Sequence, residues 1–354
     1  MEHDDYYDLK IILWLILFLV FGIIIIACKP SARDYVMTVN GPESPGKMGV
    51  TLEHEHVLVD FIGADSTGYF RWNRDSVIAR IIPFFEDAKQ KGLKTFIDCS
   101  PQYLGRDPWI LKELSRQTGV NFITNTGYYG SGRNKHVPAS FFNEDVSQVA
   151  QRWINEFTSG IETSGVRPGF IKIAVENDSV ISPDHKKIVT AAALTHIKTG
   201  LPIASHTGPD HLAFGQMKIL KDMNVDPSAF IWVHAQNGTM EGIINAARQG
   251  VWISLDNIRY RPNLEPGEKS SIEWYASRIA EMKRLGLLDK VLISHDSGWY
   301  DPAKPGGGNI NGYTDIFNYL IPALEKLDFT RKDIDTLLSI NPGQAFKIRR
   351  KQNI

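Results

Sequence analysis

Residues 49–56 read Gly49-Val50-Thr51-Leu52-Glu53-His54-Glu55-His56, where His54 and His56 close a short strand-like segment near residues 49–54. Seven more apolar segments follow, near residues 93–98, 121–126, 169–175, 201–206, 230–234, 251–255 and 291–295. Windows with an apolar period of 3.6 residues separate them, at 76–90, 108–118, 146–157, 185–199, 211–223, 240–248 and 272–285. Continuous apolar strands that alternate with helices indicate a parallel sheet covered on both faces. Eight such units predict an α/β fold, a (β/α)₈ TIM barrel.

The alternative fold is an open, doubly wound sheet, which gathers its ligands at one crevice from two or three adjacent strands. In this chain the polar residues that close apolar segments come from the first, fourth, fifth, sixth and eighth segments. They are His54, His56, Lys172, His206, His234 and Asp296. Side chains spread over so many strands can converge only if the sheet closes, so we favour the barrel.

The overall composition is that of an ordinary globular protein. Of 354 residues, 43% are hydrophobic and 22% are charged, which leaves ample material for a core. The formal net charge of −1 gives no basic surface, and this argues against nucleic acid as a partner. The two cysteines, Cys28 and Cys99, do not form a disulfide framework.

The first 28 residues are predicted to be a leader that precedes the barrel. Residues 11–27 are an apolar run that ends at Cys28 in the sequence Ile25-Ile26-Ala27-Cys28. This ending resembles the lipobox of bacterial lipoproteins, where the chain is cut before a cysteine that receives lipid. We therefore expect a lipoprotein-type signal segment over residues 1–28, a polar tether over 29–40 and the barrel over 41–354. The barrel would then be anchored in the bacterial cell envelope and face the periplasm.

An uncleaved membrane anchor is the competing interpretation of the leader. Residues 2–8 are acidic and Lys10 is the first cation, whereas signal peptides begin with positive charge. If the anchor stayed in place, Lys29 and Arg33 on its far side would favour a cytoplasmic barrel by the positive-inside rule. An unprocessed Met1 in the intact mass of the membrane-bound protein would identify the anchor.

The pair His54 and His56 is the sharpest local signal for chemistry. Side chains alternate between the two faces of a strand, so both imidazoles would face the barrel interior while Glu55 points outward. Two inward histidines suit a divalent metal, although a satisfied pair of core histidines would give the same pattern. The polar residues at the other strand ends favour the metal.

Lys172 and Asp296 need separate arguments. Lys172 lies between Ile171 and Ile173 in an interior strand, where its ammonium needs a buried partner. It could form a salt bridge, or become an N-carboxylated lysine whose two oxygens bridge metals; nearby histidines favour the carbamate. Of the neighbours His295 and Asp296, strand parity turns one inward. We choose Asp296, because metal-activated water needs a carboxylate to accept its proton, and place His295 at the rim.

The order HxH, Lys, His, His, Asp resembles the phosphotriesterase family of the amidohydrolase superfamily. The likeness runs through most of residues 47–347. Beyond residues 49–56 it includes Gly105-Arg106-Asp107, Thr126-Gly127, Ser254-Leu255-Asp256 and Asn341-Pro342. The resemblance implies a centre of two divalent ions, usually zinc. One ion would be held by His54, His56 and Asp296, the other by His206 and His234, with N6-carboxylated Lys172 as the bridge.

The resemblance also implies a reaction. A bridging hydroxide would attack a carbonyl carbon or phosphorus of a small ester-type substrate, such as a lactone, carboxylic ester or phosphotriester, while Asp296 accepts the proton. The alternatives are an amidohydrolase acting on C–N bonds and a non-catalytic metal-binding lipoprotein on the same barrel. Family members are often dimers, so a homodimer is a further expectation.

Substrate walls are expected from the loops that follow the strands. The candidates are Tyr128, Tyr129, Arg259, Tyr260 and Trp299. The lactonases of the family carry Asp-Arg-Tyr directly after the seventh strand. This chain reads Asp256-Asn257-Ile258-Arg259-Tyr260 there, a departure that weakens the inference of lactonase activity.

Overall fold

The computed structural model describes residues 34–349. Eight parallel strand positions surround a common axis, and their bounds are β3 (Thr51–Leu58), β4 (Thr95–Asp98), β5 (Asn121–Ile123) with β6 (Asn125–Thr126), β7 (Phe170–Ala174), β8 (Ile203–His206), β9 (Phe230–Val233), β10 (Trp252–Leu255) and β11 (Val291–Ile293). The predicted signal segment, Cys28 and most of the predicted tether lie outside the described residues.

The sheet closes on itself. One parallel ladder runs β12 (Gly298–Tyr300), β3, β4, β5, and the other runs from β6 through β7, β8, β9 and β10 to β11. Thr124 is the single residue between β5 and β6, so these two form one strand position. At the other junction the backbone N–H of Asp296 donates to the carbonyl of His54 at 3.0 Å. The predicted TIM barrel is therefore confirmed.

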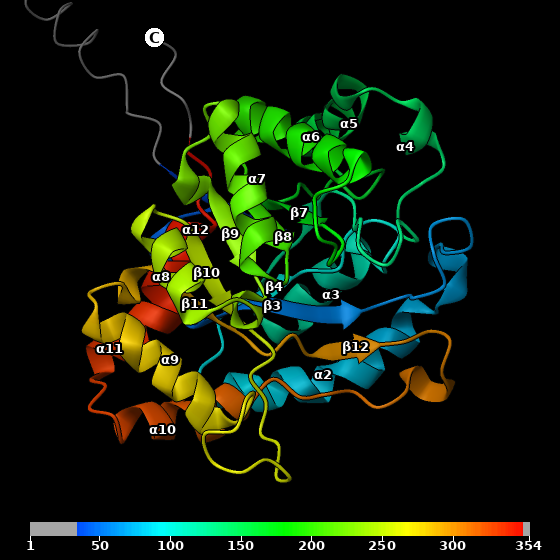
Figure 1. Ribbon diagram of the computed structural model, residues 1–354. Coiled ribbons are helices and arrows are strands. Elements are labelled where there is room, and N and C mark those ends of the chain that lie inside the picture. Colours follow the sequence, from blue (N-terminus) through cyan, green and yellow to red (C-terminus); the bar gives the residue numbers. More distant parts are fainter. Residues whose placement is uncertain (1–33, 350–354) are drawn as a thin grey trace, which may run out of the picture. The chain divides into compact units, whose positions relative to one another are not determined.

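Helices cover the outside of the barrel, as Figure 1 shows. Those that follow strands are α2 (Arg74–Gln90), α3 (Pro108–Thr118), α5 (Val146–Ser159), α6 (Pro183–Thr199), α7 (Asp210–Asp222), α8 (Met240–Arg248) and α9 (Ile272–Arg284). Shorter segments are α4 (Ser140–Asn143), η7 (Ile316–Leu320) continued by α10 (Ile321–Glu325), and α11 (Arg331–Asp335) continued by η8 (Thr336–Ile340) and α12 (Asn341–Ala345). Each long helix lies within a few residues of its predicted window.

Helix α3 illustrates how the sequence sets these boundaries. The side chain of Asp107 accepts hydrogen bonds from the backbone N–H groups of Trp109 and Ile110, and Pro108 occupies the first turn. Asp107 is thus a typical N-cap, and proline is tolerated where no intrahelical donor is needed. The helix ends at Gly119, whose φ of 71° lies in the left-handed region that glycine adopts without strain.

The barrel interior is layered along each strand. An apolar cluster inside it contains Phe170 of β7 and Ala204 of β8. Residues two positions further along the same strands, Lys172 and His206, share that face because side chains alternate. Apolar side chains thus fill one level of the barrel, and polar ones follow at the carboxyl ends of the strands. The larger apolar cluster packs between barrel and helices.

A short hairpin precedes the first barrel strand. It consists of β1 (Val36–Thr38) and β2 (Gly41–Glu43), paired antiparallel. Val36 is fully buried in the interior cluster, and the N–H of Val39 donates to the carbonyl of Phe122 at 2.8 Å. The tether predicted over residues 29–40 was therefore drawn too long, because residues 34–40 belong to the folded barrel unit. Val36 packs inside the barrel, and Met37 and Val39 belong to the larger apolar cluster between barrel and helices.

Residues 34–349 contain no helix with the length and apolar character that crossing a bilayer requires.

Candidate metal centre

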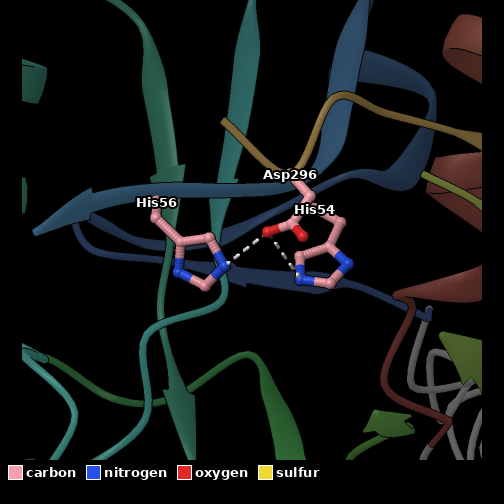
Figure 2. Close-up of side chains that lie close together, drawn as sticks. All are labelled: His54, His56 and Asp296. Atoms are coloured by element: carbon pink, nitrogen blue, oxygen red, sulfur yellow. Dashed lines mark ion pairs between the residues drawn. The ribbon is translucent and has the colours of Figure 1, made fainter. Parts of the chain in front are cut away.

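Three predicted ligands meet beside β3, within which His54 and His56 lie. Nε2 of His56 lies 3.1 Å from Oδ1 of Asp296, and Nε2 of His54 lies 3.9 Å from the same oxygen. Figure 2 shows both imidazoles, from β3, directed toward the carboxylate, which comes from the segment after β11. These ligand atoms lie within 4.8 Å of one another, close enough to share one cation.

Asp256, which follows β10, fixes the orientation of two imidazoles. Its Oδ2 lies 2.9 Å from Nδ1 of His54, and its Oδ1 lies 2.5 Å from Nδ1 of His234. The carboxylate also accepts hydrogen bonds from the backbone N–H of His234 and from the side chain of Gln236. An ionised carboxylate can only accept, so both Nδ1 atoms carry protons and both Nε2 lone pairs remain free to bind a metal.

His56 is oriented by a different partner. Its Nδ1 lies 2.9 Å from Oγ of Ser100. That hydroxyl donates its proton to the carbonyl of Leu58 at 2.7 Å, so it can only accept from the imidazole. Nε2 of His56 is therefore left with its lone pair, on the side of Asp296.

Lys172 and His206 complete the group around the same space. Nζ of Lys172, a residue that is 1% exposed, lies 3.3 Å from Nε2 of His54. The rings of His206 and His234 pack edge to face with centroids 4.3 Å apart. The hydroxyl of Tyr129 lies 3.1 Å from Nδ1 of His206. All six predicted ligand residues thus border one space.

The surroundings favour the metal-binding protonation state at His54, His206 and Asp296, whereas at His234 the Asp256 carboxylate outweighs burial and raises the pKa. Burial, helped by Lys172, lowers the pKa of His54 to about 4, and burial lowers the pKa of His206 well below its usual range. Burial opposes ionisation of Asp296, yet the neighbouring imidazoles of His56, His54 and His234 hold its pKa below the usual value. Neutral imidazoles and an ionised carboxylate are the forms that bind divalent ions.

The donor set therefore fits a divalent transition metal. Imidazole nitrogen and carboxylate oxygen suit zinc and its neighbours, and a second group of possible ligands contains His54, His234 and Asp256. Both oxygens of Asp256 are already engaged by imidazole Nδ1–H groups. We therefore assign Asp256 to orienting the ligands. The sequence did not predict this role, because it showed only that an acidic residue follows the seventh strand.

The ligands line one wall of a cavity of about 270 Å³. Of the predicted substrate-binding residues, Tyr129 and Trp299 line it. The other lining residues are Val59, Phe61, Leu104, Ser131, Gly132 and His136. These residues lie in the loops after the first three strand positions. The sequence did not predict them as cavity residues, because loops have no regular spacing.

Tyr128, Arg259 and Tyr260 do not reach the cavity. Tyr128 is fully buried against Trp153, because consecutive residues face opposite ways and Tyr129 takes the inward side. The guanidinium of Arg259 donates to the backbone carbonyls of His295 and Asp296. Tyr260 is exposed and its ring stacks on Tyr319, with centroids 4.3 Å apart. The prediction that these three line the substrate pocket is wrong.

His295 was expected at the rim and is instead fully buried. Its Nδ1 lies 2.6 Å from Oε1 of Glu55, the outward residue between the two histidines of β3. The interaction holds the segment that carries Asp296, whose φ of 53° is in the left-handed region. A residue other than glycine keeps such a backbone conformation only when its surroundings enforce it.

The histidines and the carboxylate gather at the face of a closed parallel barrel where TIM-barrel enzymes carry out their chemistry. The chain belongs to the phosphotriesterase family, whose family model matches residues 34–346. The resemblance drawn from the strand-end residues is thereby confirmed.

Similar proteins carry different activities in their names. A phosphotriesterase homology protein of Escherichia coli is 28% identical, over 84% of this chain and 98% of that protein. An aryldialkylphosphatase of Saccharolobus solfataricus is 28% identical, over 84% and 95%. An N-acetyltaurine hydrolase of Salmo salar is 22% identical, over 87% and 96%. The chain is therefore a hydrolase of this family, and the relatives span more than one type of bond.

Proposed function

We propose that the protein is a binuclear metal-dependent hydrolase that cleaves ester-type bonds in small substrates. The observation that carries the proposal is the convergence of six side chains from five strand positions on one cavity. They are His54, His56, Lys172, His206, His234 and Asp296. His54, His56 and Asp296 would hold one ion, and His206 and His234 the other.

When bound, two divalent ions supply the Lewis acidity that makes water nucleophilic at neutral pH and polarises the scissile bond; zinc suits these ligands. The carboxylate of Asp296 accepts the proton that the attacking water loses. Its pKa, held below the usual value, keeps the carboxyl ionised at neutral pH, and its Oδ1 lies 3.1 Å from Nε2 of His56. Asp256 keeps His54 and His234 in the tautomer that leaves Nε2 free.

Lys172 is proposed to act as an N6-carboxylysine. Its amine would add to carbon dioxide, with loss of one proton, to give a carbamate with a single negative charge and two oxygen ligands. An ammonium 3.3 Å from a metal-binding imidazole nitrogen would repel the cation bound there, whereas a carbamate would bridge two cations. Intact-mass measurement of the native protein tests this, with a gain of one carbon dioxide that is absent in Lys172→Ala.

Asp296→Asn tests the reaction. The amide still offers an oxygen ligand but cannot accept a proton, so turnover should fall by about 10²- to 10⁴-fold while metal content stays close to two ions per chain. The control is Asp289→Asn, at an exposed position. Hydrolysis would be followed on lactones, aryl esters and phosphotriesters with zinc- or manganese-loaded protein. A wild-type rate in Asp296→Asn, or a metal-loaded wild type inert on every ester, contradicts the proposal.

Hydrolysis of an amide is the second candidate, because similar proteins are N-acetyltaurine hydrolases. Among the described residues that line the cavity, Lys172 is the one lysine or arginine, and it is assigned to the metals. The apolar side chains of Val59, Phe61 and Leu104 line the cavity beside the ligands. The cavity therefore favours neutral amides over acidic ones, and uncharged N-aryl acetamides belong in the same panel as the esters.

A further inference from the structure

His136 is a cavity residue that takes no part in the metal centre. It lies in the loop that follows β6, is 5% exposed, and lines the cavity together with Tyr129 and Leu104. Its backbone bridges to Tyr129 in antiparallel fashion, and the two rings meet edge to face with centroids 6.0 Å apart. Tyr129 in turn contacts the ligand His206, so one ring separates His136 from the metal centre.

One nitrogen of His136 has its proton fixed by the backbone. Nδ1 lies 3.1 Å from the carbonyl oxygen of Tyr103. A carbonyl oxygen can only accept, so Nδ1 must be the donor and must carry a proton. The loop is held in place by the hydrogen bond from the N–H of Ala64 to the carbonyl of Lys135. The hydrogen bond from Nδ1 to the carbonyl of Tyr103 therefore fixes the position of the His136 ring.

The other nitrogen is an unprotonated acceptor. A proton on Nε2 would make the ring a buried cation, and no carboxylate in the described part of the chain forms an ion pair with His136. Burial lowers the pKa of His136, and Lys135 adds to this; the carbonyl of Tyr103 and Asp60 act in the opposite direction. Asp60 is itself paired with Arg71. The imidazole is thus neutral at pH 7, and within residues 34–349 Nε2 has no protein hydrogen-bond partner.

We propose that His136 is a specificity-determining residue, whose Nε2 accepts a hydrogen bond from an N–H or O–H group of the substrate. This inference rests on the proposed hydrolytic function and narrows its substrates to those that carry a donor a short distance from the scissile bond. The remaining wall of the cavity is apolar at Val59, Phe61 and Leu104. The recognised molecule therefore combines an apolar part with one polar donor group.

Matched esters test the preference. Acetates of ortho-, meta- and para-hydroxyphenol are compared with their O-methyl ethers, which keep the size and remove the donor. For at least one ring position the metal-loaded wild type should favour the hydroxyl ester in kcat/KM by about tenfold, the worth of one hydrogen bond. His136→Phe should abolish that preference. His136→Gln, whose amide oxygen can accept in place of Nε2, should restore part of it. The matched control is His211→Gln at an exposed position, which should leave the preference intact.

A second measurement does not depend on activity. The ¹⁵N spectrum of protein labelled at histidine, with His136→Phe to assign the signal, reports which ring nitrogen carries the proton. Protonated Nδ1 with unprotonated Nε2 is expected at pH 7, and the opposite tautomer or a cation overturns the inference. Equal preference in wild type and His136→Phe also overturns it. A wild type that hydrolyses none of the esters would contradict the proposed function. The ¹⁵N spectrum would still show whether Nε2 of His136 is an unprotonated acceptor.

Discussion

Oε1 of Glu55 lies 2.6 Å from Nδ1 of His295, and both side chains are fully buried. The carboxylate of Glu55 also accepts from the hydroxyl of Ser294 and from the backbone N–H groups of His295 and Ser297. Nε2 of His295 accepts from the N–H of Ile316, which fixes the proton on Nδ1. The middle residue of the HxH motif thus holds the strained segment on which Asp296 lies.

Glu55→Gln should destabilise the protein by about 3 kcal/mol. The four donors around the carboxylate need acceptors, and the amide of glutamine replaces one oxygen with a donor, which leaves buried N–H groups unpaired. Urea unfolding measures the change. Glu86→Gln, at an exposed helical position, is the control and should change stability by less than about 0.5 kcal/mol. Equal midpoints for the two variants would show that Glu55 does not hold the segment.

Asp256→Asn should weaken metal binding. The amide cannot accept from both Nδ1 atoms, so His54 or His234 can rotate or change tautomer and lose its aligned Nε2. Loss of such an outer partner costs about 10- to 100-fold in metal affinity. Equilibrium dialysis against zinc buffers measures the affinity, with exposed Asp222→Asn as the control. Unchanged affinity in Asp256→Asn would remove the residue from the orientation of the ligands.

Periodicity and strand ends predicted much of this architecture. The eight strands and the convergence of Lys172 with His54 follow from two general facts: alternating strands and helices build a parallel sheet, and the carboxyl ends of parallel strands meet at one face. Metal ligands that lie on barrel strands can therefore be predicted from the order of residues along the chain.

Side-chain contacts in the loops could not be predicted from the sequence in this way. Tyr128 and Tyr129 are adjacent tyrosines, and the backbone of the loop decides which one faces the cavity. Arg259 has the right charge for a substrate anion, yet its guanidinium bonds backbone carbonyls. His136 gave no signal, because its position beside Tyr129 results from a single antiparallel bridge within an irregular loop. Loop backbone conformation carries this information, and no period in the sequence encodes it.

Glu53 should make stability depend on pH in the metal-free protein. Burial raises its pKa to about 8 from a usual value of 4.5; Asp256 adds to this, while its hydrogen bond with Ser254 opposes it. The folded state then binds a proton between these pH values that the unfolded state releases, so this contribution to stability is complete below pH 4.5 and is lost as pH rises to about 8.

Glu53→Gln removes the titration. Relative to this variant, chelator-treated wild type should lose stability steadily as pH rises through that window in urea unfolding. Glu86→Gln again serves as the control and should follow the wild type. Parallel curves for wild type and Glu53→Gln would show that the carboxyl is ionised throughout.

Gly127 should tolerate no side chain, because it approaches the strand that carries Lys172. A Cβ at this position would lie 2.0 Å from the carbonyl oxygen of Lys172, and its φ of 122° is one that other residues rarely adopt. Gly119 has a φ of 71° but open space around it, so Gly119→Ala measures backbone strain without the clash. Gly127→Ala should cost about 1–3 kcal/mol more than Gly119→Ala in urea unfolding, since the backbone must shift. It should also weaken zinc binding, because that shift moves Lys172; equal stability and equal affinity in the two variants would mean that the loop yields without disturbing the centre.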